Sequence, residues 1–342
     1  MDADSLSHDL SYEDAYETSL APLFLARGLL DLVHVAESTG MLAALRAQSS
    51  GDALSEATGL PGVAVSSVLE ALEVNDVVVR EGDHFQLTAP WLVLTGDEAS
   101  VPMSATLASS EVERAVIRGL GKGADYWEMS SEERLVFARA ISPDPFSPGV
   151  IAGMRRGLTA DPTYDVLGSG GSLLELGCGV AGRVLSMLQA LPEMRAVGIE
   201  LAEDLAAVAA SRAEELGVSD RFEVVTSDAA GFDRPDSFDL GYWSQFFFAE
   251  ASRGPALETM RRSLRSGGVA EAPLLGDPTE LADDPRGQTA RERAVFRVVL
   301  GSWGVPDRSA AELVAEFDAH GFVDVEAGVG PFGNWRVRGR RP

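Results

Sequence analysis

The 342-residue chain has very little cysteine, lysine and histidine. Cys178 is the one cysteine, so no disulfide can form within the chain, as is expected of a protein in the reducing cytoplasm. Lys122 is the one lysine, whereas arginine, alanine, glycine and valine are abundant. This skew indicates a GC-rich genome and carries no functional information. We therefore expect a cytoplasmic protein without disulfides.

Positive charge is also scarce. Lys and Arg number 28 against 53 Asp and Glu, which gives a formal net charge of −25. Such an excess of acid opposes binding to nucleic acids and to anionic membranes. No apolar run approaches the roughly 20 residues that span a bilayer, and the acidic N-terminus lacks the apolar core of a signal peptide. These absences predict no nucleic-acid partner and no membrane partner.

Internal repeats and low-complexity stretches are absent from the sequence, and its length suffices for two domains. The most informative segment is residues 173–182, LLELGCGVAG. An apolar run that contains Glu175 leads into Gly177, Gly179 and Gly182, which have G-x-G-x-x-G spacing. This pattern predicts a strand, a tight turn and a helix N-terminus. The glycines allow close approach of a ligand and the helix end offers free N–H groups, so we expect a nucleotide-type cofactor site.

Two further predicted strands each end in an acid. Residues 195–200 end in Glu200, and residues 221–228 end in Asp228. An acid at the end of the second strand can accept hydrogen bonds from ribose hydroxyls. A helix is predicted between these strands, over residues 203–216. The remaining strands are predicted over residues 237–242, after the turn at residues 264–269, and over residues 321–326 and 331–338.

An acid two residues before the first glycine, with this order of elements, resembles the class I S-adenosylmethionine (SAM) methyltransferases over residues 172–338. The resemblance implies an α/β fold, a Rossmann-like, doubly wound and mostly parallel sheet with an antiparallel last strand, and it implies SAM as cofactor. The glycine turn would hold the methionine moiety, the second acid the ribose and the third acid the adenine. The implied cofactor-binding residues are Glu175, Gly177, Gly179, Gly182, Glu200, Leu201, Asp228, Ala229, Phe232, Tyr242 and Trp243.

The N-terminal third has a winged-helix pattern. Apolar periodicity predicts helices over residues 20–40 and 41–46, and a helix-turn-helix with a two-stranded wing over residues 52–87. DNA is the first partner to consider, but residues 52–91 contain seven acids and one base, Arg80. Such a surface cannot neutralise phosphates. Placed before a SAM core, the pattern resembles bacterial small-molecule O-methyltransferases, in which it is a dimerisation element, so we expect a homodimer.

Three regions are predicted along the chain: a mainly α winged-helix dimerisation domain (1–100), a helical linker and pocket wall (101–163) and a SAM-binding catalytic domain (164–342). Residues 123–128, GADYWE, resemble the linker of the family. Trp127 within this linker is either a core aromatic or part of the acceptor pocket. The acidic run at residues 277–284 is expected to be a solvated loop. No histidine accompanies these acids, so no metal site is predicted.

The segment after the fourth strand departs from the family. Family members carry a His-Asp pair there, but Phe248 occupies the histidine position, and no histidine occurs between His84 and His320. An aromatic cluster takes the place of the base, and either packs beneath the sheet or lines an apolar acceptor pocket. We assign Phe247 and Phe248, with Trp127, to substrate binding. The candidate catalytic residues are Glu250, Glu271 and Tyr164, with Asp277 as a weaker one.

The predicted function is SAM-dependent methylation of a small, aromatic or apolar secondary metabolite, at carbon, oxygen or nitrogen, without the usual histidine base. Three alternatives stay open. A nicotinamide oxidoreductase could use the same glycine turn with Glu200. A ligand-sensing regulator could use the winged helix, although its acids oppose DNA binding. A methyltransferase-fold enzyme could retain SAM and perform cyclisation, decarboxylation or hydroxylation.

Overall fold

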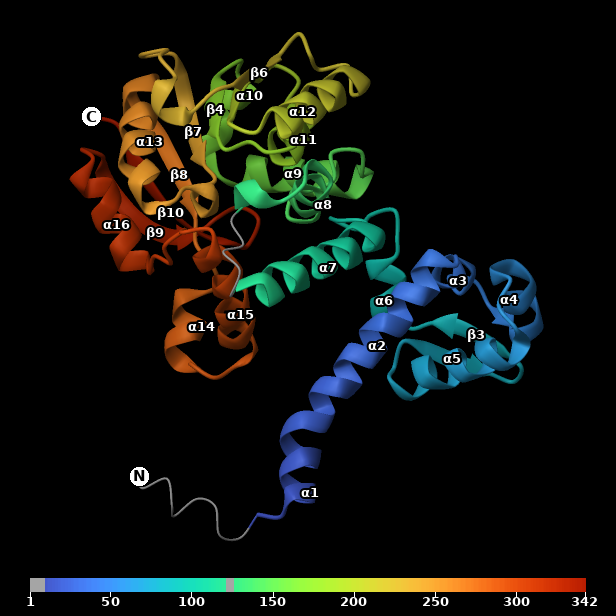
Figure 1. The fold of residues 1–342 in the computed structure, drawn as a ribbon. Coiled ribbons are helices and arrows are strands. Elements are labelled where there is room, and N and C mark those ends of the chain that lie inside the picture. The colour runs from blue at the N-terminus through green and yellow to red at the C-terminus, as the bar shows by residue number, and fades with distance from the viewer. Residues whose placement is uncertain (1–9, 121–125) are drawn as a thin grey trace. The chain divides into compact units, whose positions relative to one another are not determined.

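The computed structural model describes residues 10–120 and 126–342. The chain divides after Gly96 into two compact units, residues 1–96 and 97–342, which are considered separately (Figure 1). Part of the predicted linker motif, residues 123–125, and His8 lie outside the described residues. The helical stretch after Gly96 belongs to the second unit rather than standing alone.

The first unit is mainly helical, with a small antiparallel sheet in the strand order β1-β3-β2. Its core is formed by apolar side chains that include those of α2, α3, α4 and α5, among them Leu42, Leu54 and Leu72, all fully buried. The elements are α1 (Tyr12–Ala15), the π-helix η2 (Tyr16–Leu20), α2 (Ala21–Ser38), α3 (Met41–Ala44), β1 (Ser49–Ser50), α4 (Gly51–Thr58), α5 (Gly62–Val74), β2 (Val78–Glu81), β3 (His84–Leu87) and α6 (Ala89–Leu94).

Local chemistry sets the boundaries of the helix pair α4 and α5. The Ser50 hydroxyl accepts a hydrogen bond from the Ala53 N–H and caps the start of α4. Gly59 ends that helix at φ +70°, a conformation that favours glycine. Pro61 immediately precedes α5. The two helices and the β2–β3 hairpin therefore occupy the residues for which a helix-turn-helix and wing were predicted.

The long N-terminal helical stretch differs from the sequence-based expectation. Residues Tyr12–Ser38 form a helix long and apolar enough, by length and composition alone, to cross a membrane, with a mean hydropathy of 1.4. The sequence argument considered uninterrupted apolar runs, and Arg27 and Asp31 interrupt this one. Only 11% of the most apolar part is buried within the protein. Its large exposed side chains include Leu23, Phe24 and Leu25.

The second unit contains a seven-stranded sheet in the order β6-β5-β4-β7-β8-β10-β9. Strands β4 to β8 run parallel, and β10 is antiparallel to both of its neighbours. The sheet strands are β4 (Ser172–Leu176), β5 (Arg195–Glu200), β6 (Phe222–Thr226), β7 (Phe238–Trp243), β8 (Leu264–Pro273), β9 (Val323–Val329) and β10 (Trp335–Arg340). This is the predicted doubly wound sheet with one antiparallel strand near its end.

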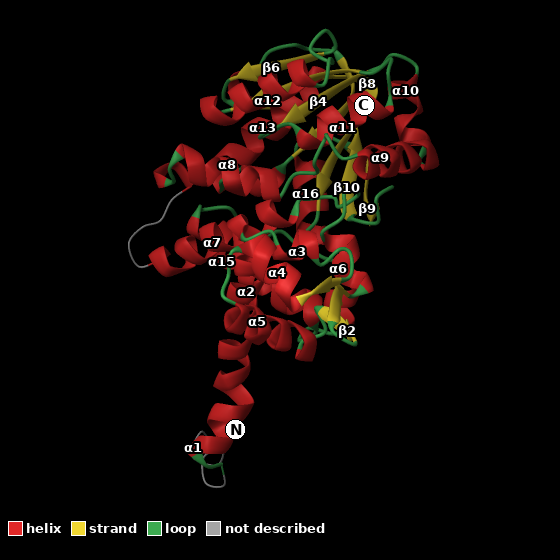
Figure 2. Cartoon of the chain, turned by 90° about the vertical axis from the view of Figure 1, so that its right-hand side faces the viewer, coloured by secondary structure: helices red, strands yellow, loops and turns green. Residues whose placement is uncertain are grey.

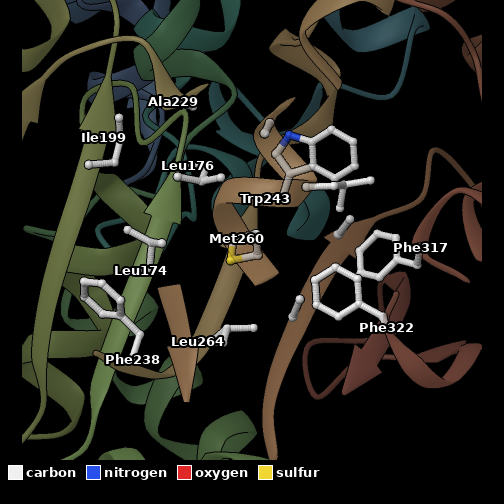
Figure 3. Packing of buried hydrophobic residues seen from close by; sticks show 14 of the residues in the cluster. Leu174, Leu176, Ile199, Ala229, Phe238, Trp243, Met260, Leu264, Phe317 and Phe322 are labelled. Carbon is white, nitrogen blue, oxygen red and sulfur yellow. The ribbon is translucent and has the colours of Figure 1, made fainter. Parts of the chain in front are cut away.

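Helices lie on both faces of this sheet, as Figure 2 shows. The helices α9, α10, α11 and α12 pack against one face, and α13 and α16 pack against the other. Their bounds are α9 (Pro148–Ala160), α10 (Asp165–Gly168), α11 (Gly182–Ala190), α12 (Glu203–Glu215), α13 (Glu250–Ser263) and α16 (Ala310–Ala319). Alternate residues of β4 point to opposite faces, so Leu173 enters one core and Leu174 the other. Figure 3 shows the second core, where Leu174, Leu176, Met260 and Phe317 gather.

The second unit also contains helices outside the two layers that cover the sheet. They are α7 (Met103–Gly119), α8 (Ser131–Ala140), α14 (Pro278–Asp283) and α15 (Gln288–Ser302), with the 3-10 turns η4 (Tyr126–Glu128), η5 (Pro162–Tyr164), η6 (Ala229–Gly231) and η7 (Gln245–Phe247). Side chains from α7, α8 and α15 share a small core around Phe137 and Leu300. The prediction of a loop at residues 277–284 was wrong, because the Asp277 carboxylate caps a short helix by accepting from the Thr279 and Glu280 N–H groups. The described residues contain no cluster of potential metal ligands.

Candidate active site

A cavity of about 870 Å³ opens at the carboxyl ends of β4, β5, β6 and β7. Ligands bind at this edge in open α/β sheets because the loops that leave the strands surround it. The volume lies toward the upper end of the range of roughly 300–1,000 Å³ for small-molecule sites. Its lining includes the glycine turn, the strand-end acids and several aromatic side chains.

The glycine turn leaves room where side chains would otherwise stand. Gly177 has φ +73°, and a Cβ there would lie 3.1 Å from the ring of Phe248. Gly179 has φ +55°, lines the cavity, and has nothing within 4 Å of the position a Cβ would take. The turn is fixed to β5, because the Gly177 and Cys178 N–H groups both donate to the Ile199 carbonyl. Gly179 therefore offers an open, rigid cradle for a ligand.

Glu200 is held in place by backbone donors at the end of β5. Its carboxylate accepts hydrogen bonds from the Gly179 N–H at 2.8 Å and from the Ala202 N–H at 2.9 Å. The residue is 8% exposed. Burial raises the pKa of this carboxyl, and the backbone N–H groups oppose that rise. The carboxylate thus lies in a fixed orientation at the cavity edge.

The third predicted strand-end acid, Asp228, also lines the cavity, together with Ala229 and Leu201. The Asp228 side chain accepts a hydrogen bond from the Ala230 N–H at 2.9 Å, which caps the turn η6. Leu201 is half exposed and Ala229 is buried. The acids Glu200 and Asp228 thus follow neighbouring strands and meet at one edge, as the sequence predicted.

Glu175 and Arg183 are buried charged residues in the cavity lining. Glu175 is 3% exposed, and its Oε2 has no hydrogen-bond partner in the described structure. Burial raises the pKa of Glu175 to about 7, with Arg183 opposing the rise and Glu200 adding to it. The Arg183 guanidinium carbon lies 3.7 Å from the centre of the Tyr242 ring. Burial raises the pKa of Tyr242 to about 12, so its phenol stays neutral.

Seven aromatic side chains line the cavity and are called the aromatic chamber here: Tyr126, Trp127, Phe137, Phe247, Phe248, Trp303 and Phe332. Within this set, the Tyr126 ring makes edge contacts with Trp127 and Trp303, each at a centroid distance of 5.2 Å. Trp127 is 52% exposed, so it is a wall residue and not a core aromatic. The described cavity lining contains no histidine.

The fold is similar to that of known proteins. Residues 173–268 match the family described as "Methyltransferase domain". A calicheamicin-biosynthesis methyltransferase, CalO1, solved with S-adenosylhomocysteine (SAH), superposes with a TM-score of 0.70, at 18% identity, over 98% of this chain and 100% of that one. A putative O-methyltransferase from Nostoc punctiforme gives 0.73, at 14% identity, over 97% and 100%. The chain has the class I methyltransferase fold.

A curated relative matches a shorter span of the chain. The uncharacterized protein YjhP of Escherichia coli (strain K12) is 30% identical over 135 residues, which are 40% of this chain. The matched part spans half the length of YjhP. The predicted fold class is thus confirmed by the similarity to solved structures, and residues 173–268 resemble a methyltransferase domain.

The cradle fits SAM by its own geometry. An open position at Gly179, a preoriented carboxylate at Glu200 and an unpartnered carboxylate oxygen on Glu175 lie around one cavity. These groups suit a ligand with ribose hydroxyls and positive charge. Tyr242 and Asp228 line the same space.

Three predicted cofactor residues lie elsewhere. Trp243 is fully buried in the core between the sheet and α13, with the Arg253 guanidinium 4.7 Å from its ring centre (Figure 3). Phe232 packs in the same core against Phe238. Gly182 does not line the cavity; a Cβ there would come within 2.2 Å of the Pro143 carbonyl and the Ser142 hydroxyl. Its glycine is required by the close approach of the 142–143 loop and not by a ligand.

The base candidate nearest to the histidine position is also displaced. Glu250 does not line the cavity, and both of its carboxylate oxygens accept hydrogen bonds at 2.7 Å from Arg308. Its side chain is 68% exposed. Glu250 begins α13, so the helix carries its side chain away from the strand ends. The proposal of Glu250 as a base is therefore wrong.

Glu271 and Tyr164 belong to a buried structural network. The Tyr164 hydroxyl donates to Glu271 at 2.6 Å, and Arg336 donates to that hydroxyl at 2.8 Å and pairs with Glu271 at 2.9 Å. Arg336 also pairs with Asp161. None of these residues lines the cavity, and burial and the charge of Glu271 raise the pKa of the Tyr164 phenol. The network joins β8, β10 and η5 and offers no base to a substrate.

Sequence reasoning missed Arg183, Ser244 and Trp303 as cavity residues. Arg183 could have been found, because it follows directly on the last glycine of the motif, in the first turn of the helix. Trp303 comes from the end of α15, far from any motif, and the sequence holds no signal for its position.

Proposed function

We propose that the protein is a SAM-dependent methyltransferase that acts on a small, aromatic or apolar metabolite and uses no histidine base. The observation that carries this proposal is the continuity of one cavity from the open glycine cradle and the strand-end acids to the aromatic chamber. Such a cavity can hold a nucleoside-type cofactor and a planar acceptor side by side.

The cofactor would be held by the glycine turn and the strand-end acids. Gly177 and Gly179 would lie against its chain, Glu200 would accept from the ribose hydroxyls, and Asp228 with the Ala229 backbone would contact the adenine. Tyr242 would contribute an aromatic face near the positive charge. When bound, SAM supplies an activated methyl group. The protein then has to align the acceptor and exclude water.

The acceptor would lie in the aromatic chamber. Its walls are largely aromatic and apolar, and the cavity lining adds hydroxyl groups such as those of Ser142 and Ser244, the amide of Asn334, and the charged side chains of Glu98 and Arg156. The predicted candidates Glu250, Glu271 and Tyr164 do not reach the cavity, and no histidine lines its described part. A carbon or nitrogen nucleophile, or an oxygen acid that is already ionised, would need no histidine base.

Two further statements belong to the proposal. The protein would be a cytoplasmic homodimer joined through its first hundred residues as a winged-helix dimerisation domain, because α2 leaves a large apolar surface exposed. The missing histidine base also keeps the non-methylating alternative open, in which the enzyme retains SAM and performs other chemistry such as cyclisation or decarboxylation.

The direct test is product analysis with methyl-labelled SAM and a panel of phenols, enols and aromatic amines, followed by the pH dependence of turnover. We expect transfer of label to an acceptor, and a pH profile that does not change when His8, His34, His84 or His320 is replaced by glutamine. A limb near the ordinary histidine pKa of about 6.5 that disappears in one of these variants would contradict the base-free reaction. Conversion of the acceptor without label, with SAM left intact, would establish the non-methylating alternative.

A further inference from the structure

We propose that the acceptor is an aromatic compound that carries a carboxylate, and that Arg156 on α9 binds this carboxylate. The inference rests on the proposed function and names the class of substrate that the aromatic chamber would take. It is carried by a cation in the cavity lining that has no partner among the described residues, and that lies over a glycine of its own helix.

Arg156 is one of two cations in the described lining of the cavity, and the other is Arg183. The acids and phenols around Arg183 stabilise its positive charge. In contrast, no ion pair and no side-chain hydrogen bond joins the Arg156 guanidinium to another described residue. A guanidinium cannot lose its charge in a protein, and its N–H groups form a fork that matches the two oxygens of a carboxylate. The unpaired donors of Arg156 therefore suit an anionic group of a ligand.

The Arg156 side chain lies along the cavity side of α9. Side chains of a helix lean toward its N-terminus and cover the preceding turn. In agreement, Nη2 of Arg156 stands 3.8 Å from the position that a Cβ on Gly153 would take, and nothing else outside the helix backbone lies within 4 Å of that position. Gly153 itself lines the cavity, although a glycine inside a helix is less stable there than alanine. The guanidinium thus borders open space in the cavity wall.

The segment between β9 and β10 brings an aromatic ring and an amide to the same helix. A Cβ on Gly157, the residue after Arg156, would overlap the ring of Phe332, so glycine at this position lets the ring pack directly on α9. Phe332 and Asn334 both line the cavity. An amide N–H can donate a further hydrogen bond to a carboxylate. An aromatic acid, which has a planar ring and an anionic end, is complementary to this combination of ring, amide and cation.

The acids of the cavity leave few places for a carboxylate. Glu98 lies at the other end of the same helix side, because a Cβ on Gly149 would stand 2.7 Å from the Glu98 Cβ. Gly149 precedes Gly153 by about one helical turn, and no ion pair joins Glu98 to Arg156 in the described structure. The lining also contains the acids Glu175, Glu200 and Asp228. Like charges repel across a binding site, so Arg156 decides whether the cavity accepts an anion.

The test is calorimetric titration of the SAH-saturated protein with two probes of the same shape, 2-naphthoate and 2-naphthamide. Saturation with SAH keeps both probes out of the cofactor site. We expect the wild type to bind 2-naphthoate about 10-fold more tightly than 2-naphthamide, a typical gain from a charged hydrogen bond. Arg156→Gln should abolish this preference by weakening 2-naphthoate alone, and unchanged binding of 2-naphthamide also shows that the variant is folded. Arg156→Lys should keep part of the preference, because it retains the charge without the fork.

Arg155→Gln is the matched control, because Arg155 is an exposed arginine of α9 that does not line the cavity. It should alter neither affinity, and an equal loss of 2-naphthoate binding in this variant would overturn the inference. A wild type that binds SAH without preferring 2-naphthoate, or a preference that survives Arg156→Gln, would also overturn it and leave the proposed function standing. A wild type that does not bind SAH would refute the proposed function itself, and the inference with it.

Discussion

At the scale of single residues, the site is built from charges that the fold holds away from water. Glu200 is compensated by backbone N–H groups, and the Glu271–Arg336–Tyr164 network is compensated internally. Glu175 and Arg183 act on each other electrostatically, but the Oε2 atom of Glu175 and the Nη1 atom of Arg183 have no hydrogen-bond partner in the described structure. Buried polar atoms without partners are rare in folded proteins, and they mark positions where function has been retained at a cost in stability.

That cost can be measured at Glu175. Its pKa is raised to about 7 by burial from an ordinary value of 4.5, so the folded protein binds the proton more tightly than the unfolded chain. The contribution of Glu175 to the free energy of unfolding therefore falls as pH rises from about 4.5 to about 7. We expect ligand-free Glu175→Gln to gain about 3 kcal/mol relative to the wild type across this window, measured by urea unfolding at several pH values.

Glu214→Gln, at an exposed position on α12, controls for the loss of one negative charge. Its difference from the wild type should stay flat across the same pH range. A flat difference for Glu175→Gln as well would show that Glu175 is ionised without penalty, contrary to the geometry.

At the scale of elements, the sequence predicted what is tied to the backbone. The strand residues 195–200 and the helix starting at Glu203 occur as expected, because an apolar run between turn signals has few alternatives in a parallel sheet. The positions of Glu200 and Asp228 were predictable for the same reason, because both lie at the ends of apolar runs that form strands. The base candidates failed, because η7 and the start of α13 rotate Glu250 outward, and a one-residue difference in a turn redirects a side chain entirely. Trp303 and Phe332 reach the chamber only through tertiary packing.

Helix α2 has large apolar side chains that are exposed to solvent and have no role within the fold of one chain. Leu23 and Phe24 of α2, and Leu20 at the end of η2, are exposed at helical spacing. We expect the double variant Leu23→Asp/Phe24→Asp to convert a dimer into a monomer, with the second unit still folded, as measured by light scattering after size exclusion at micromolar concentration. Val295→Asp, an equally exposed valine on α15, should leave the dimer intact. A wild-type monomer at that concentration would contradict the homodimer.

At the scale of the whole molecule, the account rests on the cofactor. The acidic charge, the sheet order and the matched domain agree with a small-molecule methyltransferase fold, but the glycine spacing alone is shared with nicotinamide enzymes. The feature that separates them is the open cradle at Gly179 beside the acids Glu175 and Glu200. A valine at position 179 would fill this cradle and strain a turn with φ +55°.

The most direct measurement is therefore calorimetric titration of the wild type, Gly179→Val and Gly217→Val with SAM and with NAD⁺. Gly217 is a matched control, since it has φ +66°, open space at its Cβ position and no place in the cavity lining. We predict one SAM bound per chain in the wild type and in Gly217→Val, no measurable SAM binding in Gly179→Val, and no binding of NAD⁺ by any of them. Binding of NAD⁺ in preference to SAM, or SAM affinity unchanged by Gly179→Val, would contradict the account.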